Sequence, residues 1–463
     1  MAYERYHIST KTWPNQASPV PKFVITRADN CINCGKCERS CIFGVHKRSE
    51  QDPRKMADPV NALCKNCFMC IQECPQRALT MMPGTDYREL GRGVWTSLRV
   101  STIWGESETG KIPVLGAGYR GMFAGPGYDG MWTDMSEIVR PTRDGIHGRE
   151  FISTSVDIGS KPSALEFGKD GGLQTHVPQI IEIQVPIVMD STRLRGLTSK
   201  MLAGWSNAAR NLDTLMFAAP AVVSEEIHGA QINHFVPVYP DGTDVRTILV
   251  PNGVRMAELQ YTPSWREDAK RFKSMYPHTL LAMRVRSGKG VEKQVLDMAK
   301  AKIEVAHIDF DDEGMELDSH APRHAKDSLR AVHKTLVSKS VRDQITIIAA
   351  GGIAAAEHIP KTLICGADVV AMERALLVAI ECRNCVTCSM GSCPASLISV
   401  QPDWIEGRVT NLVGAWRDQL LEVLGAMGIR EVRRLRGELG RAIFYDDVET
   451  EAFSDIGGGD DNG

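Results

Sequence analysis

Twelve of the thirteen cysteines in this 463-residue chain fall into three short runs, and their spacing constrains the chain more than any other feature. The first two runs, CINCGKCERSC and CKNCFMCIQECP, have the cysteine spacing of bacterial two-cluster ferredoxins. The third run, ECRNCVTCSMGSCP, lies near the other end of the chain and has a longer last gap, and only Cys365 lies outside all three. The pattern indicates iron–sulfur clusters and therefore electron transfer.

Two-residue gaps let successive thiolates bind one iron–sulfur cube, and a remote fourth cysteine completes its ligands. In two-cluster ferredoxins the fourth cysteine of each run binds the other cluster, which predicts two 4Fe–4S clusters here. The predicted ligands of the first cluster are Cys31, Cys34, Cys37 and Cys74, and those of the second are Cys64, Cys67, Cys70 and Cys41. The third run supplies Cys382, Cys385, Cys388 and Cys393 to a third cluster.

Zinc and disulfides are the competing interpretations of these cysteines. Structural zinc sites also use CxxC pairs, but they need two pairs separated by a longer loop, whereas each N-terminal run places four cysteines within eleven residues. Disulfide frameworks are typical of short secreted chains, and the N-terminus MAYERYHIST is too polar for a secretory signal. Thiolates committed to clusters need a reducing compartment, so we expect a cytoplasmic protein.

The charge balance limits the partners. With 54 basic and 57 acidic side chains the formal net charge is -3, which argues against binding to nucleic acid or to a membrane surface. No apolar run approaches the length that spans a bilayer. We expect small molecules and redox proteins, such as ferredoxin or other oxidoreductase subunits, as partners.

Composition divides the chain into five parts. Residues 1–85 carry the first two cysteine runs and indicate a small domain that its clusters stabilise. Residues 86–178 are rich in Gly, Trp and Met and lack a sustained period, which indicates a connecting segment. Residues 179–400 alternate apolar and helix-period stretches, residues 401–453 are amphipathic helix, and residues 454–463 are an expected disordered tail.

The connecting segment contains a GxGxxG pattern at Gly116, Gly118 and Gly121. A dinucleotide fingerprint requires a helix to begin inside the pattern, but the following MFAGPGYDG would break one. We therefore expect a packed loop here rather than a nucleotide site.

Residues 179–400 contain eight apolar strand-like runs, most of them separated by helix-period stretches such as VEKQVLDMAKAK. This texture is typical of a parallel sheet covered by helices, and eight units predict a closed (β/α)8 barrel of the α/β class. A doubly wound open sheet is the alternative, because some of the crossovers look short.

The expected active site of such a barrel lies at the C-terminal ends of its strands, where the last two units bind phosphate through glycine-rich loops. Gly351 and Gly352, in AAGGIAAAEHIPK, follow the seventh predicted strand, and bare amides before a helix favour a dianionic phosphate. A plain turn that needs small residues is the competing interpretation. Iron–sulfur clusters need a partner for two-electron chemistry, and FMN supplies that chemistry together with a phosphate. We therefore expect FMN in the barrel.

Over most of its length the chain resembles the FMN and iron–sulfur domain of glutamate synthase, in the archaeal-type form that carries an N-terminal two-cluster ferredoxin module. The most specific match is Cys382, Cys388 and Cys393, whose five- and four-residue gaps and following proline match the three-iron cluster of that family. The additional Cys385 leaves either a 3Fe–4S or a 4Fe–4S cluster open. Less specific matches are VRDQITIIAAGGI around Arg342, LLEVLGAMGIREVRRLRG and the position of His333.

The resemblance implies that Gly351, Gly352, Gly366 and Ala367 surround the FMN phosphate. Arg284, in LLAMRVRSGKG, stands where the family has a lysine near the flavin ring, and arginine would keep the positive charge there. An ion pair at the barrel rim is the other interpretation of Arg284.

The chain departs from the family at three loops. After the first barrel strand MDSTRLRGLTS retains only Gly196 of a flavin-contacting stretch, and much of the loop expected near Val254 is missing. After the sixth strand DFDDEGMEL keeps Asp312 and Gly314, but its added acids would repel the dianion 2-oxoglutarate. Those acids are Asp309, Asp311 and Glu313, and a solvated acidic loop is the simpler interpretation of them.

Three functions follow. The altered loops favour an electron-transfer subunit of a larger oxidoreductase, in which the clusters exchange electrons with a barrel-bound flavin. The preserved cysteines also suit a glutamate synthase that makes glutamate from 2-oxoglutarate and ammonia, with the ammonia taken from solution or from a partner such as a glutaminase. In the third hypothesis the barrel has lost FMN and serves as a scaffold.

Overall fold

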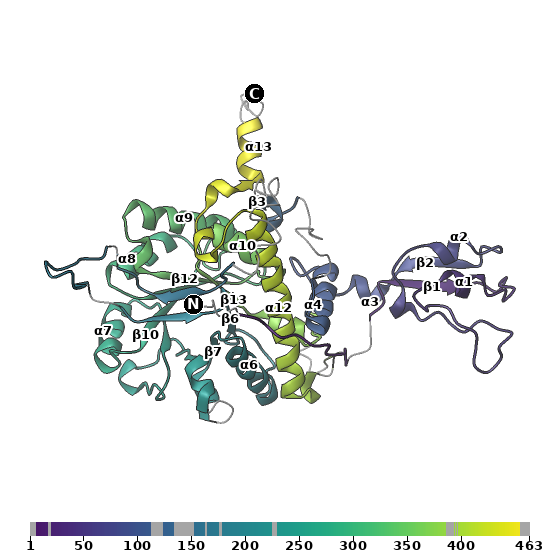
Figure 1. The fold of residues 1–463 in the computed structure, drawn as a ribbon, viewed down its shortest axis with the longest axis horizontal. Coiled ribbons are helices and arrows are strands. Elements are labelled where there is room, and N and C mark those ends of the chain that lie inside the picture. Colours follow the sequence, from purple (N-terminus) through teal and green to yellow (C-terminus); the bar gives the residue numbers. More distant parts are fainter. Residues whose placement is uncertain are drawn as a thin grey trace. The chain divides into compact units, whose positions relative to one another are not determined.

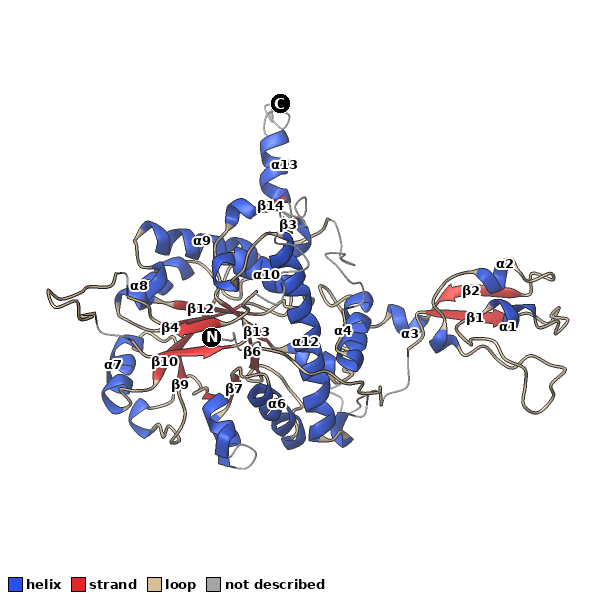
Figure 2. Cartoon of the chain, viewed as in Figure 1, coloured by secondary structure: helices blue, strands red, loops and turns tan. Residues whose placement is uncertain are grey.

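The computed structural model describes residues 6–16, 20–112, 124–133, 152–162, 164–175, 178–224, 229–385, 393, 395 and 397–453. The chain forms two compact units (Figures 1 and 2). The barrel unit comprises residues 1–13, 102–380 and 397–463, and the cysteine unit comprises residues 14–101 and 381–396. The GxGxxG glycines Gly116, Gly118 and Gly121, together with Cys388, lie outside the described residues.

Eight parallel strands form the core of the barrel unit: β6 (Ile187–Asp190), β7 (Met216–Ala218), β8 (Phe235–Pro237), β9 (Met256–Gln260), β10 (Leu280–Arg286), β11 (Val305–Asp309), β12 (Thr346–Ala350) and β13 (Val369–Met372). Their pairing runs in the order β8-β7-β6-β13-β12-β11-β10-β9. A parallel bridge between Val238 and Glu258 joins the two ends, and the Tyr239 N–H donates to the Glu258 carbonyl at 2.9 Å. The predicted barrel is confirmed, and the open sheet is excluded because its two edges are paired.

Helices cover most of the crossovers: α6 (Ser199–Asn211), α7 (Trp265–Met275), α8 (Val291–Lys300), α9 (Ala325–Ser338), α10 (His358–Ile364) and α11 (Arg374–Ala379). α6 begins at Thr198, whose hydroxyl accepts from the Met201 N–H. The two crossovers between β7 and β9 contain only the short 3-10 turns η5 (Pro220–Ser224), η6 (Gly229–His234) and η7 (Val245–Thr247). These are the crossovers that look too short in the sequence.

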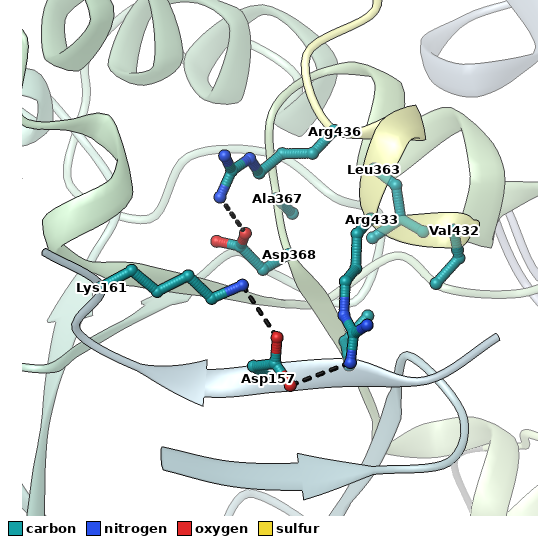
Figure 3. Close-up of a pocket in the computed structure, with 9 residues that line it drawn as sticks. Asp157, Lys161, Leu363, Ala367, Asp368, Val432, Arg433 and Arg436 are labelled. Carbon is teal, nitrogen blue, oxygen red and sulfur yellow. Dashed lines mark hydrogen bonds and ion pairs between the residues drawn. The ribbon is translucent and has the colours of Figure 1, made fainter. Parts of the chain in front are cut away.

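An antiparallel hairpin of β4 (Val156–Gly159) and β5 (Ile180–Ile183) packs at the N-terminal end of the barrel. The Gly159 N–H donates to Thr346 Oγ1 at 2.9 Å, and that hydroxyl donates to the Gly159 carbonyl at 2.8 Å. Thr346 is the first residue of β12, so the hairpin covers the end opposite the expected active site. A pocket between β4, α10 and the turn η11 (Val432–Leu435) opens there (Figure 3).

The long helix α12 (Pro402–Ala426) begins with a proline, which the first helical turn tolerates, and packs against α6. Its fully buried Arg408 donates to the carbonyls of Ala379 at 2.6 Å, Trp13 at 3.0 Å and Trp104 at 3.2 Å. One guanidinium thereby links three distant segments of the barrel unit. The remaining elements of this unit are η2 (Gly127–Gly130), η10 (Leu397–Ser399), η12 (Leu439–Arg441), α13 (Tyr445–Phe453) and the paired strands β3 (Met131–Thr133) and β14 (Ala442–Phe444).

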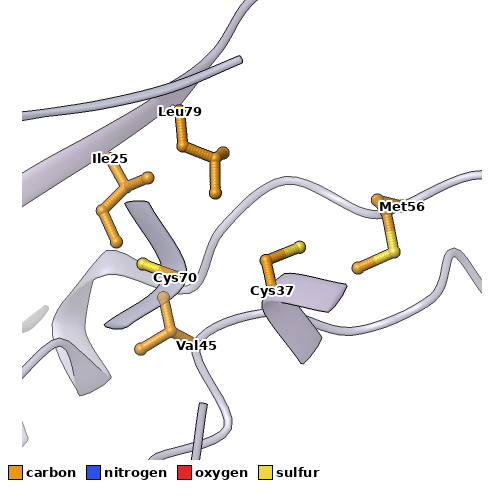
Figure 4. Packing of buried hydrophobic residues seen from close by; sticks show 6 residues of the cluster. All are labelled: Ile25, Cys37, Val45, Met56, Cys70 and Leu79. Carbon is orange, nitrogen blue, oxygen red and sulfur yellow. The ribbon is translucent and has the colours of Figure 1, made fainter. Parts of the chain in front are cut away.

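The cysteine unit is built on the antiparallel pair β1 (Phe23–Arg27) and β2 (Leu79–Pro83), with short helices α1 (Lys36–Ser40) and α2 (Met69–Gln72) between them. η1 (Asn61–Leu63) and α3 (Thr85–Arg88) lie in this unit, and α4 (Ser97–Thr109) follows it. Its small core contains Cys37 and Cys70 beside Ile25, Val45, Met56 and Leu79 (Figure 4). None of the described helices of either unit is long and apolar enough to cross a membrane.

Candidate functional site

The two N-terminal cysteine runs share one uncommon backbone conformation. Asn33 and Asn66, which precede the second cysteine of each run, have φ of 55° and 59°. Gly35 and Phe68, which follow that cysteine, have φ of 72° and 60°. Left-handed residues in such turns gather main-chain N–H groups into the anion-binding concavities found at iron–sulfur sites. A bulky residue such as Phe68 rarely adopts this conformation, and strain of this kind is typical of functional sites.

The thiols of the second run have a neighbour from the first run. The pKa of Cys70 is raised to about 11, first by burial and then by the charges of nearby thiolates. Those thiolates belong to Cys41, Cys64 and Cys67. Burial also raises the pKa of Cys37, and the charge of Cys31 acts in the same direction. The neighbours of Cys70 are thus the three residues with which it is expected to share a cluster.

The third run repeats the beginning of the first two. Each run starts with Cys-x-Asn-Cys, and Asn384 has φ of 51°. The Asn384 N–H donates to Cys382 Sγ at 3.4 Å. Within the same unit, the Gly91 N–H donates to the Arg383 carbonyl at 3.1 Å. The segment from 381 to 396 therefore belongs structurally with the N-terminal cysteines.

None of the described cysteines forms a disulfide. Cys37, Cys70 and Cys382 are buried, Cys34 and Cys67 are exposed, and Cys31, Cys41, Cys64, Cys74, Cys385 and Cys393 are half-buried. Within the described ranges, no group of three or more Cys, His, Asp or Glu side chains is gathered closely enough to hold a metal ion. The soft thiolates and the left-handed turns beside them fit iron–sulfur clusters, and the ligand sets stay predictions.

In the barrel unit, Arg284 crosses the barrel interior. It lies on β10, and its Nη2 donates to Asp190 Oδ2 at the end of β6 at 2.6 Å. β6 and β10 are four places apart in the closed order of eight strands, so they face each other across the barrel axis. Arg284 Nε also donates to Glu258 Oε1 at 2.5 Å, and Nη1 lies 3.4 Å from Asp309 Oδ1. Arg284 is only 5% exposed, so its ion pairs lie in the interior rather than at the rim.

The pKa of Arg284 is held well above its ordinary value, because its three carboxylate partners outweigh the burial that by itself would lower it. The same guanidinium, together with His307 and the Thr192 hydroxyl, lowers the pKa of Asp190 despite the opposing effect of burial. The cluster is therefore a set of mutually stabilised charges in the middle of an apolar barrel.

Two buried atoms next to this cluster have no hydrogen-bond partner among the described residues: His307 Nε2 and Glu373 Oε1. His307 lies on β11 with its Nδ1 2.7 Å from Glu258 Oε2, and Glu373 directly follows β13. Burial, and then the charge of Asp190, raise the pKa of Glu373 to about 8, although Arg193 opposes this rise. Glu373 is therefore largely protonated at neutral pH.

The structure places the four predicted phosphate residues at two opposite ends of the barrel. Gly351 and Gly352 follow β12 at its C-terminal end, whereas Gly366 and Ala367 precede β13 at its N-terminal end. β12 and β13 are parallel neighbours, so one phosphate cannot contact all four residues. The glycine pair is the half that lies at the expected active-site end.

Glycine is also needed at these two positions for packing. A Cβ on Gly352 would lie 2.6 Å from the Gly314 Cα and N, and one on Gly351 would lie 2.5 Å from the carbonyl oxygens of Phe310 and Asp311. The loop after β11 therefore lies directly against the glycine pair. The phosphate role of the pair stays a prediction beside this packing role.

The acidic loop after β11 is ordered by its own charges. Asp311 Oδ1 accepts from the N–H groups of Glu313 at 2.9 Å and Met315 at 2.8 Å, and Asp312 pairs with Arg374. Asp309 is buried and contacts Arg284 and Arg193. The loop is thus more than a solvated acidic run. Gly196, between β6 and α6, has φ of 71° and open space around its Cβ position.

The sequence interpretation missed the charged residues inside the barrel strands. Glu258 stands in MAELQ and His307 in VAHID, both of which are otherwise apolar strand sequences. A charge in a buried strand is costly unless it is paired, and this is the signal that marks them. Among the described residues, His307 Nε2 and Glu373 Oε1 make no hydrogen bond and have only ion-pair contacts, with Asp190 at 3.8 Å and with Arg193 at 3.6 Å. These two atoms and the left-handed glycine pair fit a bound group at the C-terminal end of the barrel, and protonated Glu373 is compatible with a phosphate.

Comparison with known proteins gives matches over most of the chain. Residues 265–430 match the family model described as the conserved region in glutamate synthase. The archaeal-type glutamate synthase (NADPH) of Dehalococcoides mccartyi is 22% identical over 480 residues, which cover 90% of this chain and 94% of that protein. The archaeal glutamate synthase (NADPH) of Archaeoglobus fulgidus is 24% identical over 514 residues, which cover 95% and 98%. The flavin-binding domain of baker's yeast flavocytochrome b2 superposes with a TM-score of 0.44 at 12% identity over 81% of this chain and 84% of that one.

The fold and its residue clusters define a (β/α)8 barrel protein that carries a separate cysteine-rich unit. The chain is similar, at 22% to 24% identity over at least nine tenths of its length, to archaeal-type glutamate synthases, and its residues 265–430 match the region conserved in glutamate synthase.

Proposed function

We propose that this protein is an iron–sulfur oxidoreductase of the glutamate synthase family, in which clusters in the cysteine unit exchange electrons with FMN at the C-terminal end of the barrel. The observation that carries the proposal is the conformation common to the three cysteine runs. Asn33, Asn66 and Asn384 have φ of 55°, 59° and 51°, and each stands directly before the second cysteine of its run. Three copies of one left-handed turn support three sites of one chemistry.

The proposed cofactors are two 4Fe–4S clusters, a third cluster held by the run that starts at Cys382, and FMN. Gly351 and Gly352 would bind the FMN phosphate, while Arg284 lies deeper, in the barrel interior. When bound, FMN couples the single-electron chemistry of the clusters to two-electron transfer.

Three side chains of the barrel, Arg284, Glu373 and Arg193, determine which groups near that site are charged and which can hold a proton. Three carboxylates hold the Arg284 guanidinium in place, so its charge is fixed by the protein before any ligand arrives. The raised pKa of Glu373, about 8, lets its carboxyl group hold and release a proton near neutral pH. Arg193, which is 28% exposed, donates to the Phe310 carbonyl at 2.6 Å and lies 3.6 Å from Glu373, so it keeps a positive charge beside this carboxyl.

We place the protein in the cytoplasm, as part of a larger redox assembly with a ferredoxin or another oxidoreductase subunit as partner. A second candidate function is glutamate synthesis from 2-oxoglutarate and ammonia. It is favoured because the relatives that align with at least nine tenths of this chain are named glutamate synthases. The loops that depart from the family after the first and sixth barrel strands speak against a retained substrate pocket, and for this reason the electron-transfer role ranks first.

Anaerobic purification followed by iron, sulfide and flavin counts tests the proposal. We expect about 11 to 12 irons and about one FMN per chain. Fewer than about 8 irons in a fully loaded sample would contradict the cluster assignment. Bound flavin without glutamate formation supports the electron-transfer subunit. Glutamate formation from 2-oxoglutarate and a reduced donor supports the second candidate. Clusters without flavin would indicate that the barrel serves as a scaffold.

A further inference from the structure

The beginning of the third cysteine run bears on the number of irons in its cluster. Three cysteines suffice for a three-iron cluster, whereas a four-iron cubane uses four thiolates. If the third cluster had three irons, its ligands would be Cys382, Cys388 and Cys393, and Cys385 would be a spare thiol. The backbone around Cys385 argues against a spare residue.

Cys385 stands in the same local structure as Cys34 and Cys67. Each is preceded by an asparagine with positive φ, at 51° for Asn384, 55° for Asn33 and 59° for Asn66. A left-handed conformation costs a residue with a Cβ about 1 kcal/mol, and asparagine is one of the few that tolerate it. Nothing in a spare thiol requires this conformation, whereas the two N-terminal runs adopt it between their first two expected ligands.

Hydrogen bonds fix this turn. The Asn384 N–H donates to Cys382 Sγ at 3.4 Å, so the first thiol of the run already accepts a main-chain amide, as cluster sulfurs do. The Arg383 carbonyl accepts from Gly91, and the Glu381 carboxylate accepts from the Gln16 N–H at 3.0 and 3.1 Å. Partners from the same unit thus hold the backbone on both sides of Cys382.

Resting on the proposed function, we propose that Cys385 is a ligand of the third cluster and that this cluster is a four-iron cubane. Cys365, which lies outside all three cysteine runs, provides a contrast. It is fully buried on the barrel side, next to Met131, and has no asparagine before it.

Low-temperature EPR of the anaerobically purified, oxidised protein decides the question. An oxidised three-iron cluster is paramagnetic and an oxidised four-iron cubane is diamagnetic, so the wild type should lack the three-iron signal and contain about 12 irons. Cys385→Ser should gain that signal at about one spin per chain and lose about one iron. Cys365→Ser is the matched control and should behave as the wild type.

A wild-type sample with about 11 irons and one three-iron signal per chain would overturn this inference while leaving the proposed function standing. A wild type with fewer than about 8 irons would instead overturn the proposed function. If Cys385→Ser does not accumulate, the wild-type spectrum and iron count still decide.

A second observation, independent of the clusters, concerns the pocket at the N-terminal end of the barrel (Figure 3). This hollow lies between β4, α10 and η11, and its empty space of about 380 Å³ includes the open solvent at its mouth. Ala367 and Asp368 line it from the start of β13, Asp157 from β4, and Lys161, Arg433 and Arg436 from the surrounding segments.

Cations outnumber the carboxylates inside this pocket. Asp157 is shared by Lys161 and Arg433, both at 2.9 Å. Asp368 is shared by Arg436 at 3.0 Å and by the buried Arg342 at 2.7 Å. Arg342 is not among the lining residues, so three cations face two carboxylates inside the pocket. The other carboxylates that pair with them, Asp343 and Glu182, are 58% and 54% exposed and lie at the solvent side.

Burial lowers the pKa of the neighbouring His333 to about 4, and Arg342 and Arg436 act in the same direction against the opposing charges of Asp368 and Asp343. We infer that the pocket binds a small dianion, because each inner carboxylate is shared by two cations. A doubly charged oxyanion in this open hollow would give Lys161, Arg433 and Arg436 further charged hydrogen-bond acceptors.

Isothermal titration of the purified full chain with inorganic phosphate and with succinate tests this site. The two ligands distinguish a phosphate site from a dicarboxylate site. We expect one of the two to bind in the micromolar to low millimolar range, and Arg433→Gln and Lys161→Gln each to weaken it about tenfold. Arg266→Gln, which removes an exposed arginine on α7, should leave binding unchanged. Absence of binding by both anions, or equal binding by the wild type and both pocket variants, would overturn the assignment.

Discussion

Arg284 on β10 donates to Asp190 on β6 at 2.6 Å, and this contact spans the barrel between two strands that face each other. Glu258 and Asp309 complete the set of carboxylates around the same guanidinium. Ion pairs therefore occupy the centre of this barrel, where packed apolar side chains fill the interior of most small barrels.

Arg284→Met should destabilise the protein strongly. The substitution leaves three buried carboxylates without their common cation, and breaking a buried pair in this way typically costs about 3–5 kcal/mol. Thermal unfolding of the full chain measures the effect. Arg286→Met, two residues along the same strand, breaks an exposed pair with Asp318 and should cost less than about 1 kcal/mol. Equal losses in the two variants would contradict the interior role of Arg284.

Glu373→Gln should flatten the dependence of stability on pH. The folded-state pKa of Glu373, about 8, lies above its ordinary value of 4.5, so between these limits the folded state binds more protons than the unfolded state. The contribution is fully present below about pH 4.5 and is lost as the pH rises toward 8, with a slope of up to about 1.4 kcal/mol per pH unit.

Denaturation midpoints of the wild type and the variant, measured from pH 5 to pH 8.5, check this slope. Glu106 provides the matched comparison, because burial raises its pKa to about 8 as well, with an opposing hydrogen bond from Trp416. Glu106→Gln should flatten the slope similarly and leave flavin content unchanged. A Glu373→Gln variant with the wild-type slope would show that Glu373 is ionised in the folded protein.

Gly352→Ala should destabilise the barrel and lower its FMN content. The residue has φ of 70°, and an added Cβ would lie 2.6 Å from the Gly314 backbone, which has no flexible side chain to move aside. The expected loss is about 2–4 kcal/mol, of which strain at positive φ accounts for about 1 kcal/mol. Gly196→Ala isolates the strain, because Gly196 has φ of 71° with nothing within 4 Å of its Cβ position. Thermal unfolding of both variants measures the two contributions, and the flavin count of Gly352→Ala checks the expected loss of FMN.

Phe68→Gly should keep the iron content and slow the loss of clusters in air. Phe68 has φ of 60° where the first run has Gly35 at 72°, so glycine relieves strain of about 1 kcal/mol. Phe68→Val, which is β-branched and tolerates this conformation least, should lower the iron bound per chain. Iron counts and the rate of bleaching check both variants, and identical rates in all three proteins would exclude strain at this position.

Much of the fold is readable from local sequence. The eight apolar runs predict the strands, because continuous apolar segments bury both faces of a parallel sheet. The short runs around β7 and β8 are the hardest to assign, since their crossovers contain 3-10 turns rather than full helices. The count of eight units predicts closure but leaves the open sheet as an alternative, and the parallel bridge between Val238 and Glu258 decides between them.

The cysteine runs show what the sequence by itself determines. Spacing of two residues between thiols and an asparagine before the second cysteine fix a local turn, and local turns depend on adjacent residues alone. Tertiary structure decided the rest. It separated Gly366 from Gly351 by placing them at opposite strand ends, and it gathered Asp190, Glu258 and Asp309 around Arg284 from positions up to 94 residues away. Charges so distant along the chain become partners only when the barrel closes, since closure removes the water that would otherwise solvate each of them separately.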